Sequence, residues 1–265
     1  MRINGLNFRK QLKMWYKQSL DLSSLTEKSG PSGYYGTFVS DFGTEEKKQL
    51  QQQLGTNAND IGVKFFRDNL RYDETPEQLK ANMIAENLAL YYIGDYINKN
   101  TNLKAPVPPI RLSLSSLLMN QHNFLITQTK KGVLIENDDI VDEMSLHFGG
   151  KQWRIRGRIE NAVYERLKQA NIYWQDCHVG NFFITPRSYQ ILMKLDSDVD
   201  IQTVNWNDFI VGATIIDFGR MDVRDNDELY NKILALKNKI IPLIQSENKL
   251  QILNKVFDQL LSGVY

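Results

Sequence analysis

The chain has 265 residues, of which 42% are hydrophobic and 24% are charged, as is typical of soluble globular proteins. Its 32 basic and 31 acidic side chains leave a net charge of +1, so the composition indicates neither nucleic-acid binding nor attachment to an anionic membrane. The single cysteine, Cys177, excludes an intrachain disulfide and a metal site built from several cysteines. No apolar run approaches the ~20 residues that a membrane-spanning helix needs. We therefore expect a soluble protein of one or two domains.

The first half of the chain carries mostly strand patterns. Glycines alternate with aromatic and β-branched residues near its start, which favours two strands joined by a tight turn. One helix is predicted by apolar periodicity, and it is opened by Thr75 as N-cap and by Pro76 in the first turn. In chain order we expect a strand pair within 30–39, a strand at 61–66, a helix over 76–98, and strands at 111–114 and 124–129.

The second half of the chain changes to helical patterns, and the change falls near residue 130. Apolar residues on one side predict a long helix over 153–170, followed by an irregular loop that leads into a strand. Two more helices are expected within 227–262, separated near Pro242. The order of elements therefore predicts an α+β fold, with a strand-rich part at 1–130 and a mostly helical part at 131–265.

Two short motifs in the second half carry the candidate chemistry. Asp176 and Asn181 lie in a loop that enters an apolar strand, and Asp217 ends an apolar strand and is followed by Phe218 and Gly219. Amide and carboxylate oxygens are ligands that hard divalent cations prefer, and a separate carboxylate near a hydroxyl can orient it and take its proton. Together the motifs resemble the catalytic loop and the magnesium-binding strand end of the protein-kinase-like superfamily.

The resemblance implies a bilobal kinase-like fold that uses ATP and Mg²⁺. By this resemblance Asp176 would orient and deprotonate the acceptor hydroxyl, while Asn181 and Asp217 would hold Mg²⁺. His178 stands where aminoglycoside and choline kinases often have histidine, and it either contacts the transferred phosphate or holds the loop by hydrogen bonds. A second Asp-Phe-Gly, at 41–43, has no apolar strand before it and is interpreted as a turn.

The first half supplies partial counterparts of the family's other parts. Gly33 and Gly36 resemble the second half of the glycine-rich turn that covers the ATP phosphates, although Pro31 stands where the first glycine would be. Lys64 resembles the strand lysine that grips the α- and β-phosphates. These residues and the helix that follows would form the N-terminal lobe, 1–130, and the remainder would form a reduced C-terminal lobe, 131–265.

Glu86 gives an argument that does not depend on the resemblance. On the predicted helix it lies in the middle of the apolar stripe, close to Leu79 and Leu90, whereas Glu77 lies on the opposite side. A buried carboxylate is costly unless a cation meets it, and Lys64 is the predicted cation. The alternative is that Glu86 reaches solvent from the edge of the stripe.

The chain also departs from ordinary protein kinases. Little sequence follows Gly219, so an activation segment, an Ala-Pro-Glu motif and substrate-binding helices are not visible. Gln175 replaces the arginine on which a phosphorylated activation loop docks. The long interval before Asp217 is interpreted as a hairpin inserted over 186–208. In these respects the sequence resembles the compact kinases that some bacterial pathogens deliver into host cells.

We therefore expect an ATP- and Mg²⁺-dependent serine/threonine protein kinase without a regulated activation segment. Its expected partners are ATP, a protein substrate and, for a bacterial effector, a host protein or activator; its expected location is the cytoplasm or a host cell. The limited room for helices between 132 and 175 favours a macromolecular acceptor. Three alternatives stay open: a small-molecule kinase, favoured by His178 and Gly180, a pseudokinase binding module, and a nucleotidyl transferase on the same fold.

Overall fold

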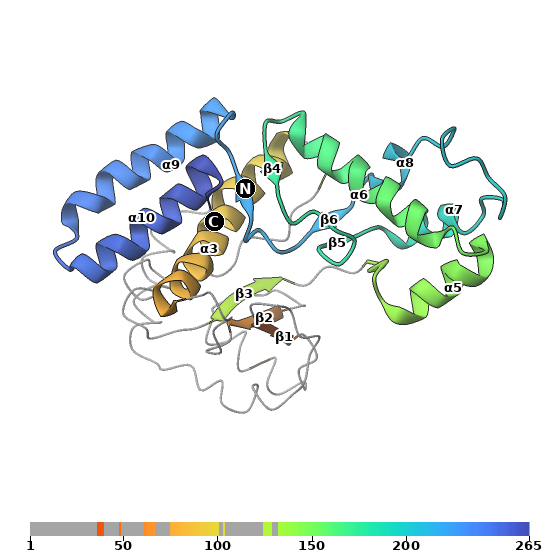
Figure 1. Cartoon of the computed structure of the whole chain (residues 1–265), viewed down its shortest axis with the longest axis horizontal. Helices are drawn as coiled ribbons and strands as arrows, with labels where there is room; N and C mark the ends of the chain where they lie inside the picture. The colour runs from red at the N-terminus through yellow and green to blue at the C-terminus, as the bar shows by residue number, and fades with distance from the viewer. Residues whose placement is uncertain are drawn as a thin grey trace. The chain divides into compact units, whose positions relative to one another are not determined.

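Figure 1 shows the computed structural model, which describes residues 36–39, 48, 61–66, 75–100, 103, 124–128 and 132–264. These residues form an α+β fold in which helices dominate and strands are short. The chain divides into two compact units, Met1–Ile84 with Val107–Thr129 and Ala85–Pro106 with Lys130–Tyr265. In the described ranges, no helix combines the length and the apolar character needed to cross a membrane.

The first unit contains a three-stranded antiparallel sheet with β2 in the centre. Lys64 lies in this central strand, opposite Phe38 on one neighbour and Leu125 on the other. The predicted strands at 61–66 and 124–129 are thus confirmed, whereas Gly33 and the expected strand at 111–114 lie outside the described residues. The strands are β1 (Gly36–Val39), β2 (Ile61–Phe66) and β3 (Phe124–Gln128).

Helix α3 (Pro76–Asn100) confirms the helix predicted from apolar periodicity. Its first turn is capped by Thr75, whose Oγ1 accepts a hydrogen bond from the Gln78 backbone N–H at 3.2 Å. Glu86 is only 5% exposed, so the carboxylate in the apolar stripe is buried and does not reach solvent from the stripe's edge. The buried apolar residues of the predicted stripe are Met83, Leu90, Ile93 and Ile97.

Helices α5 (Asp138–Phe148) and α6 (Gln152–Lys168) come first in the part of the second unit that begins at Lys130. Asn137 caps α5, because its side chain accepts a hydrogen bond from the Asp139 backbone N–H at 3.1 Å. Gly149 ends α5 in the left-handed conformation with φ of 55°, where glycine costs least. One side of α6 is buried as predicted, through Ile155, Ile159, Ala162, Val163 and Leu167.

The segment predicted as an inserted hairpin over 186–208 is not a hairpin. It contains helix α7 (Pro186–Leu192), an irregular stretch and the start of the short helix α8 (Asn207–Ile210). The prediction was wrong because Thr185 and Pro186 are helix-start residues: Thr185 Oγ1 accepts a hydrogen bond from the Ser188 backbone N–H at 3.0 Å.

This inserted segment is tied to the two helices before it. His147 of α5 places Nε2 at 2.9 Å from the Leu195 carbonyl oxygen, so His147 is half-buried and not the surface residue that its sequence context indicates. Arg158 of α6 donates from Nη2 to Gln202 Oε1 at 2.6 Å. The segment between the two motifs is therefore folded and packs against α5 and α6.

Four two-residue strands form two separate antiparallel ladders. Strand β4 (Tyr173–Trp174) pairs with β7 (Met221–Asp222), and β5 (Phe182–Phe183) pairs with β6 (Thr214–Ile215). Strands β4 and β5 flank the first motif, and strands β6 and β7 flank the second. Each ladder thus pairs a strand beside one motif with a strand beside the other.

The second unit ends in two helices that lie side by side (Figure 1). Helices α9 (Asp227–Ile240) and α10 (Glu247–Ser262) are separated by a 3₁₀ turn at Ile241–Leu243, as predicted near Pro242. Helix α10 is joined to the segment after β7, because the Val223 backbone N–H donates to the Leu260 carbonyl at 3.1 Å.

Candidate active site

The two motifs form loops that are held by the same pair of ladders. The 175–181 loop connects β4 to β5, and the 216–220 loop connects β6 to β7. Because β4 pairs with β7 and β5 pairs with β6, both ends of one loop are fixed beside both ends of the other. The sheet topology therefore brings together two motifs that are far apart in the sequence.

Backbone hydrogen bonds extend both ladders into the loops. The Gln175 N–H donates to the Arg220 carbonyl at 3.0 Å, beyond the β4–β7 pair. The Ile216 N–H donates to the Asn181 carbonyl at 2.8 Å, beyond the β5–β6 pair. Since Asp217 is the next residue after Ile216, the two predicted metal ligands lie at one end of the same ladder.

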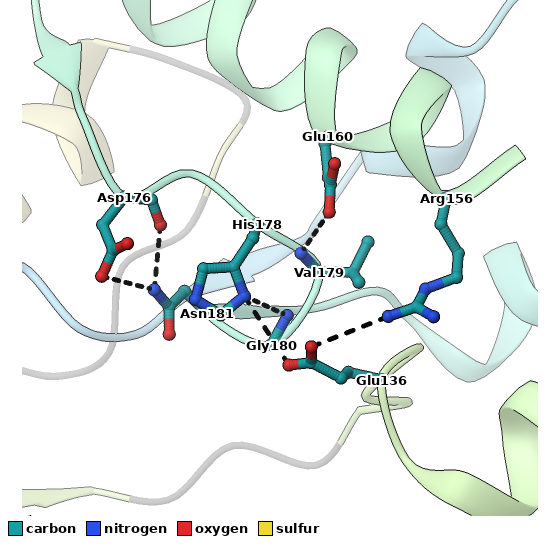
Figure 2. A network of polar contacts seen from close by, with 8 residues as sticks. All are labelled: Glu136, Arg156, Glu160, Asp176, His178, Val179, Gly180 and Asn181. Carbon is teal, nitrogen blue, oxygen red and sulfur yellow. Dashed lines mark hydrogen bonds and ion pairs between the residues drawn. The ribbon is translucent and has the colours of Figure 1, made fainter. Parts of the chain in front are cut away.

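Asn181 is 8% exposed, and its side chain is oriented by Asp176. Its Nδ2 donates to the Asp176 backbone carbonyl at 2.9 Å and lies 3.5 Å from Asp176 Oδ2. In Figure 2 the amide oxygen points away from Asp176, and within the described part of the chain Oδ1 accepts no hydrogen bond. The Asn181 amide thus presents an oxygen that a hard cation can use.

The backbone at Asp217 adopts an uncommon conformation. Its φ is +60°, in the left-handed region, which residues other than glycine adopt uncommonly and which asparagine and aspartate adopt more readily than most. The turn is closed by the Gly219 N–H, which donates to Asp217 Oδ1 at 3.2 Å. This geometry turns the chain sharply directly after β6.

Glu86 comes close to this turn. A Cβ placed on Gly219 would lie 3.2 Å from Asp217 Oδ1 and 4.0 Å from Glu86 Oε2, so the glycine leaves room for both carboxylates. The structure therefore brings Glu86 of α3 to the Asp-Phe-Gly turn. The side chain of Lys64 lies outside the described residues, so the pairing of Lys64 with Glu86 stays a prediction.

The oxygen donors beside the Asp-Phe-Gly turn are of the kind that Mg²⁺ takes as ligands. Asn181 and Asp217 supply an amide oxygen and a carboxylate, which suit Mg²⁺. Among the residues that the structure describes, no group of three or more His, Cys, Asp or Glu side chains is arranged to hold a metal. Asn181 and Asp217 would be the residues to hold Mg²⁺ here, because Mg²⁺ is commonly bound through only one or two protein side chains.

His178 makes contacts that hold the loop. Its Nδ1 accepts a hydrogen bond from the Gly180 N–H at 3.1 Å and lies 3.6 Å from Glu136 Oε2 (Figure 2). Glu136 in turn places Oε1 at 3.7 Å from Arg156 Nη2 of α6. Of the two roles predicted for His178, these contacts match the loop-holding one, and contact with a phosphate stays a prediction.

Gly180 lies against the Glu136 carboxylate. A Cβ at this position would overlap the Glu136 carboxylate and would lie 2.8 Å from His178 Cε1. Glycine therefore allows a carboxylate from the turn before α5 to approach the 175–181 loop.

Glu160 of α6 also holds the loop and was not found by sequence reasoning. Its Oε1 accepts a hydrogen bond from the Val179 N–H at 2.9 Å (Figure 2). Arg156 and Glu160 are one helical turn apart, so both lie on the same side of α6. That spacing is visible in the sequence, but no sequence signal indicates that this side faces the 175–181 loop.

Cys177 is an inert packing residue, as its sequence context indicates. Its Sγ donates to the Glu160 backbone carbonyl at 3.6 Å. Burial raises the pKa of the Cys177 thiol to about 12, with smaller contributions from the charges of Glu160 and Asp176. The thiol therefore stays protonated at neutral pH, and a nucleophilic role is not supported.

Comparisons with known proteins assign no family to the chain. No family model matches the sequence, and no curated protein matches it. Among solved structures, the complex of Rv3197 with erythromycin from Mycobacterium tuberculosis is similar at a TM-score of 0.42 and 11% identity. The match covers 95% of this chain and 64% of that chain. At this TM-score the likeness defines neither a fold family nor a function.

Proposed function

We propose that the chain is an ATP- and Mg²⁺-dependent phosphotransferase, a serine/threonine protein kinase with a reduced bilobal kinase-like fold. The observation that carries the proposal is the pairing of β4 with β7 and of β5 with β6, which sets the 175–181 loop beside the 216–220 loop. The order and spacing of Asp176, Asn181 and Asp217 add the chemistry that phosphoryl transfer requires.

Each residue of the paired loops has a proposed role. Asp176 accepts the proton of the acceptor hydroxyl, and its carboxylate Oδ2 lies 3.5 Å from Asn181 Nδ2. Asn181 Oδ1 and the Asp217 carboxylate hold Mg²⁺. When bound, Mg²⁺ neutralises negative charge on the phosphate oxygens of ATP. The left-handed backbone of Asp217 is compatible with a carboxylate held in one orientation for this purpose.

The remaining roles concern the nucleotide. We propose that Lys64 of β2 contacts the α- and β-phosphates, that Glu86 positions Lys64, and that Gly33 and Gly36 let the backbone cover the phosphates. Support comes from the central strand position of Lys64 and from the burial of Glu86 beside the Asp-Phe-Gly turn.

The test is incubation of the purified chain with Mg·ATP and basic and acidic protein acceptors, followed by intact-mass analysis. Gain of phosphate on a protein supports the proposal, gain of AMP identifies a nucleotidyl transferase, and labelling of small aminoalcohols or aminoglycosides alone identifies a small-molecule kinase. Absence of Mg·ATP binding would contradict the proposal and favour the alternative of a pseudokinase binding module.

Asp176→Ala decides whether this site performs the transfer. Transfer should fall by at least about a hundredfold, as for loss of a general base, while the affinity for Mg·ATP stays near that of the wild type. Glu165→Ala is the matched control, because Glu165 lies on the exposed surface of α6 and pairs only with Lys168 at 3.7 Å among the described contacts. Transfer that survives in Asp176→Ala and depends on Mg·ATP would show that another residue is the base.

A further inference from the structure

We propose that Glu160 is a positioning residue that fixes the 175–181 loop, and with it the contact between Asn181 and Asp176. The inference rests on the proposed phosphotransferase activity for its catalytic consequence. Its structural part concerns only α6 and the loop, both of which belong to the second unit.

The 175–181 loop needs support because its middle forms no strand and no helix. Hydrogen bonds between backbone groups hold the loop near its two ends. The Gln175 N–H donates to the Arg220 carbonyl, and the Asn181 N–H donates to the His178 carbonyl at 2.9 Å. Between these, the Gly180 N–H donates to the ring of His178 in the same loop. In the described ranges, the loop backbone N–H that donates to a side chain of another element is that of Val179, which donates to Glu160.

Glu160 holds two neighbouring points of the loop. Its carboxylate accepts from the Val179 N–H at 2.9 Å, and its backbone carbonyl accepts from the Cys177 thiol at 3.6 Å. A bond to a carboxylate is stronger than a bond between neutral groups. The side chain of Val179 is 1% exposed, so this part of the loop is fixed by burial and by a charge-assisted bond together.

The contact between Glu160 and Val179 lies close in the chain to the candidate site residues Asp176 and Asn181. Val179 lies two positions before Asn181, whose Nδ2 donates to the backbone carbonyl of Asp176. On the other side of the loop, Arg156 of α6 holds Glu136 near Gly180. One side of α6 therefore supports the loop at Val179 directly and near Gly180 through Glu136. Loss of the Glu160 carboxylate should release Val179 first and then the Asn181–Asp176 contact.

Hydrogen–deuterium exchange resolved to single amides tests the structural part. In Glu160→Ala, exchange at Val179 and Asn181 should accelerate by about tenfold or more, as expected for loss of a hydrogen bond to a charged group. Glu160→Gln keeps an acceptor oxygen and should restore a large part of the protection. Glu165→Ala should leave the loop unchanged, and amides within α6 should exchange at wild-type rates in all three variants.

Steady-state kinetics with Mg·ATP tests the catalytic part. Glu160→Ala should lower kcat by about tenfold or more with little change in KM for ATP, and Glu160→Gln should recover part of the loss. Wild-type loop exchange in Glu160→Ala would overturn the positioning role, as would a loss of protection spread evenly over the second unit. A wild-type chain that transfers no phosphate would overturn the proposed function, while the exchange data would still decide whether Glu160 fixes the loop.

Discussion

Asn181 uses the two ends of its amide for two different purposes. The nitrogen donates to the carbonyl of Asp176, which leaves the oxygen for another partner. An amide therefore suits this position, because an aspartate here would have no N–H to donate to that carbonyl. At the scale of single residues, the site therefore depends on hydrogen-bonding capacity as much as on charge.

Gly180 gives the sharpest residue-scale prediction, because the same chain offers a matched control. Gly180→Ala places a Cβ on the carboxylate of the exposed Glu136 side chain, which must move aside, and should lower the free energy of unfolding by less than about 1 kcal/mol. Gly157→Ala, on an exposed position of α6 where a Cβ meets nothing within 4 Å, should raise it by up to about 1 kcal/mol through helix propensity.

Urea unfolding of the two alanine variants measures both effects. A loss of more than about 2 kcal/mol in Gly180→Ala would contradict this expectation, because it would show that Glu136 cannot move aside. If Gly157→Ala were less stable than the wild type, α6 would not tolerate alanine at that position, and Gly157→Ala could not serve as the control for Gly180→Ala.

At the scale of elements, the end of α10 is tied to β7 and to the start of the 175–181 loop. Asp222 of β7 is fully buried, and Arg224 donates to its two oxygens at 2.9 and 3.1 Å. Gln175 donates from Nε2 to the Gly263 carbonyl at 3.1 Å, directly after α10. A Cβ on Gly263, whose φ is +65°, would overlap both Arg224 and Asp222.

Removal of Arg224 should therefore weaken this junction. Arg224→Ala removes two hydrogen-bond donors from the buried Asp222 carboxylate and should lower the free energy of unfolding by about 1–3 kcal/mol. Water can replace part of the lost hydrogen bonding, because the Arg224 side chain is half exposed. Arg154→Ala, on an exposed position of α6, should cost less than about 0.5 kcal/mol. Equal Tm values for the two variants, measured by differential scanning calorimetry, would contradict the assigned role of Arg224.

The elements also show where sequence patterns succeed. Helix α3 was predicted from apolar periodicity, and the burial of Glu86 followed from its place in the stripe. The two helices on either side of Pro242 were predicted by the same signal. The segment at 186–208 was misjudged because the hairpin was inferred from the length of the interval before Asp217, without regard to the helix-start residues Thr185 and Pro186.

For the molecule as a whole, the residues of the candidate site were predicted, but the arrangement that supports them was not. Local motifs identify Asp176, Asn181 and Asp217 because their spacing is a property of the sequence. Glu136 and Glu160 support the loop through contacts between distant segments, and two-residue strands such as β4 and β7 are too short to produce a periodic signal. Tertiary structure alone selects these partners.

The central claim is that two motifs, distant in the sequence, form one site for Mg²⁺ and ATP. Calorimetric titration of ATP with and without Mg²⁺ tests it on the wild type, Asn181→Ala, Asp217→Ala and the double variant. Mg²⁺ should tighten ATP binding to the wild type, each single variant should lose most of this gain, and the double variant should lose little more, because both residues serve one ion. Additive losses, or ATP binding that does not respond to Mg²⁺, would contradict the account.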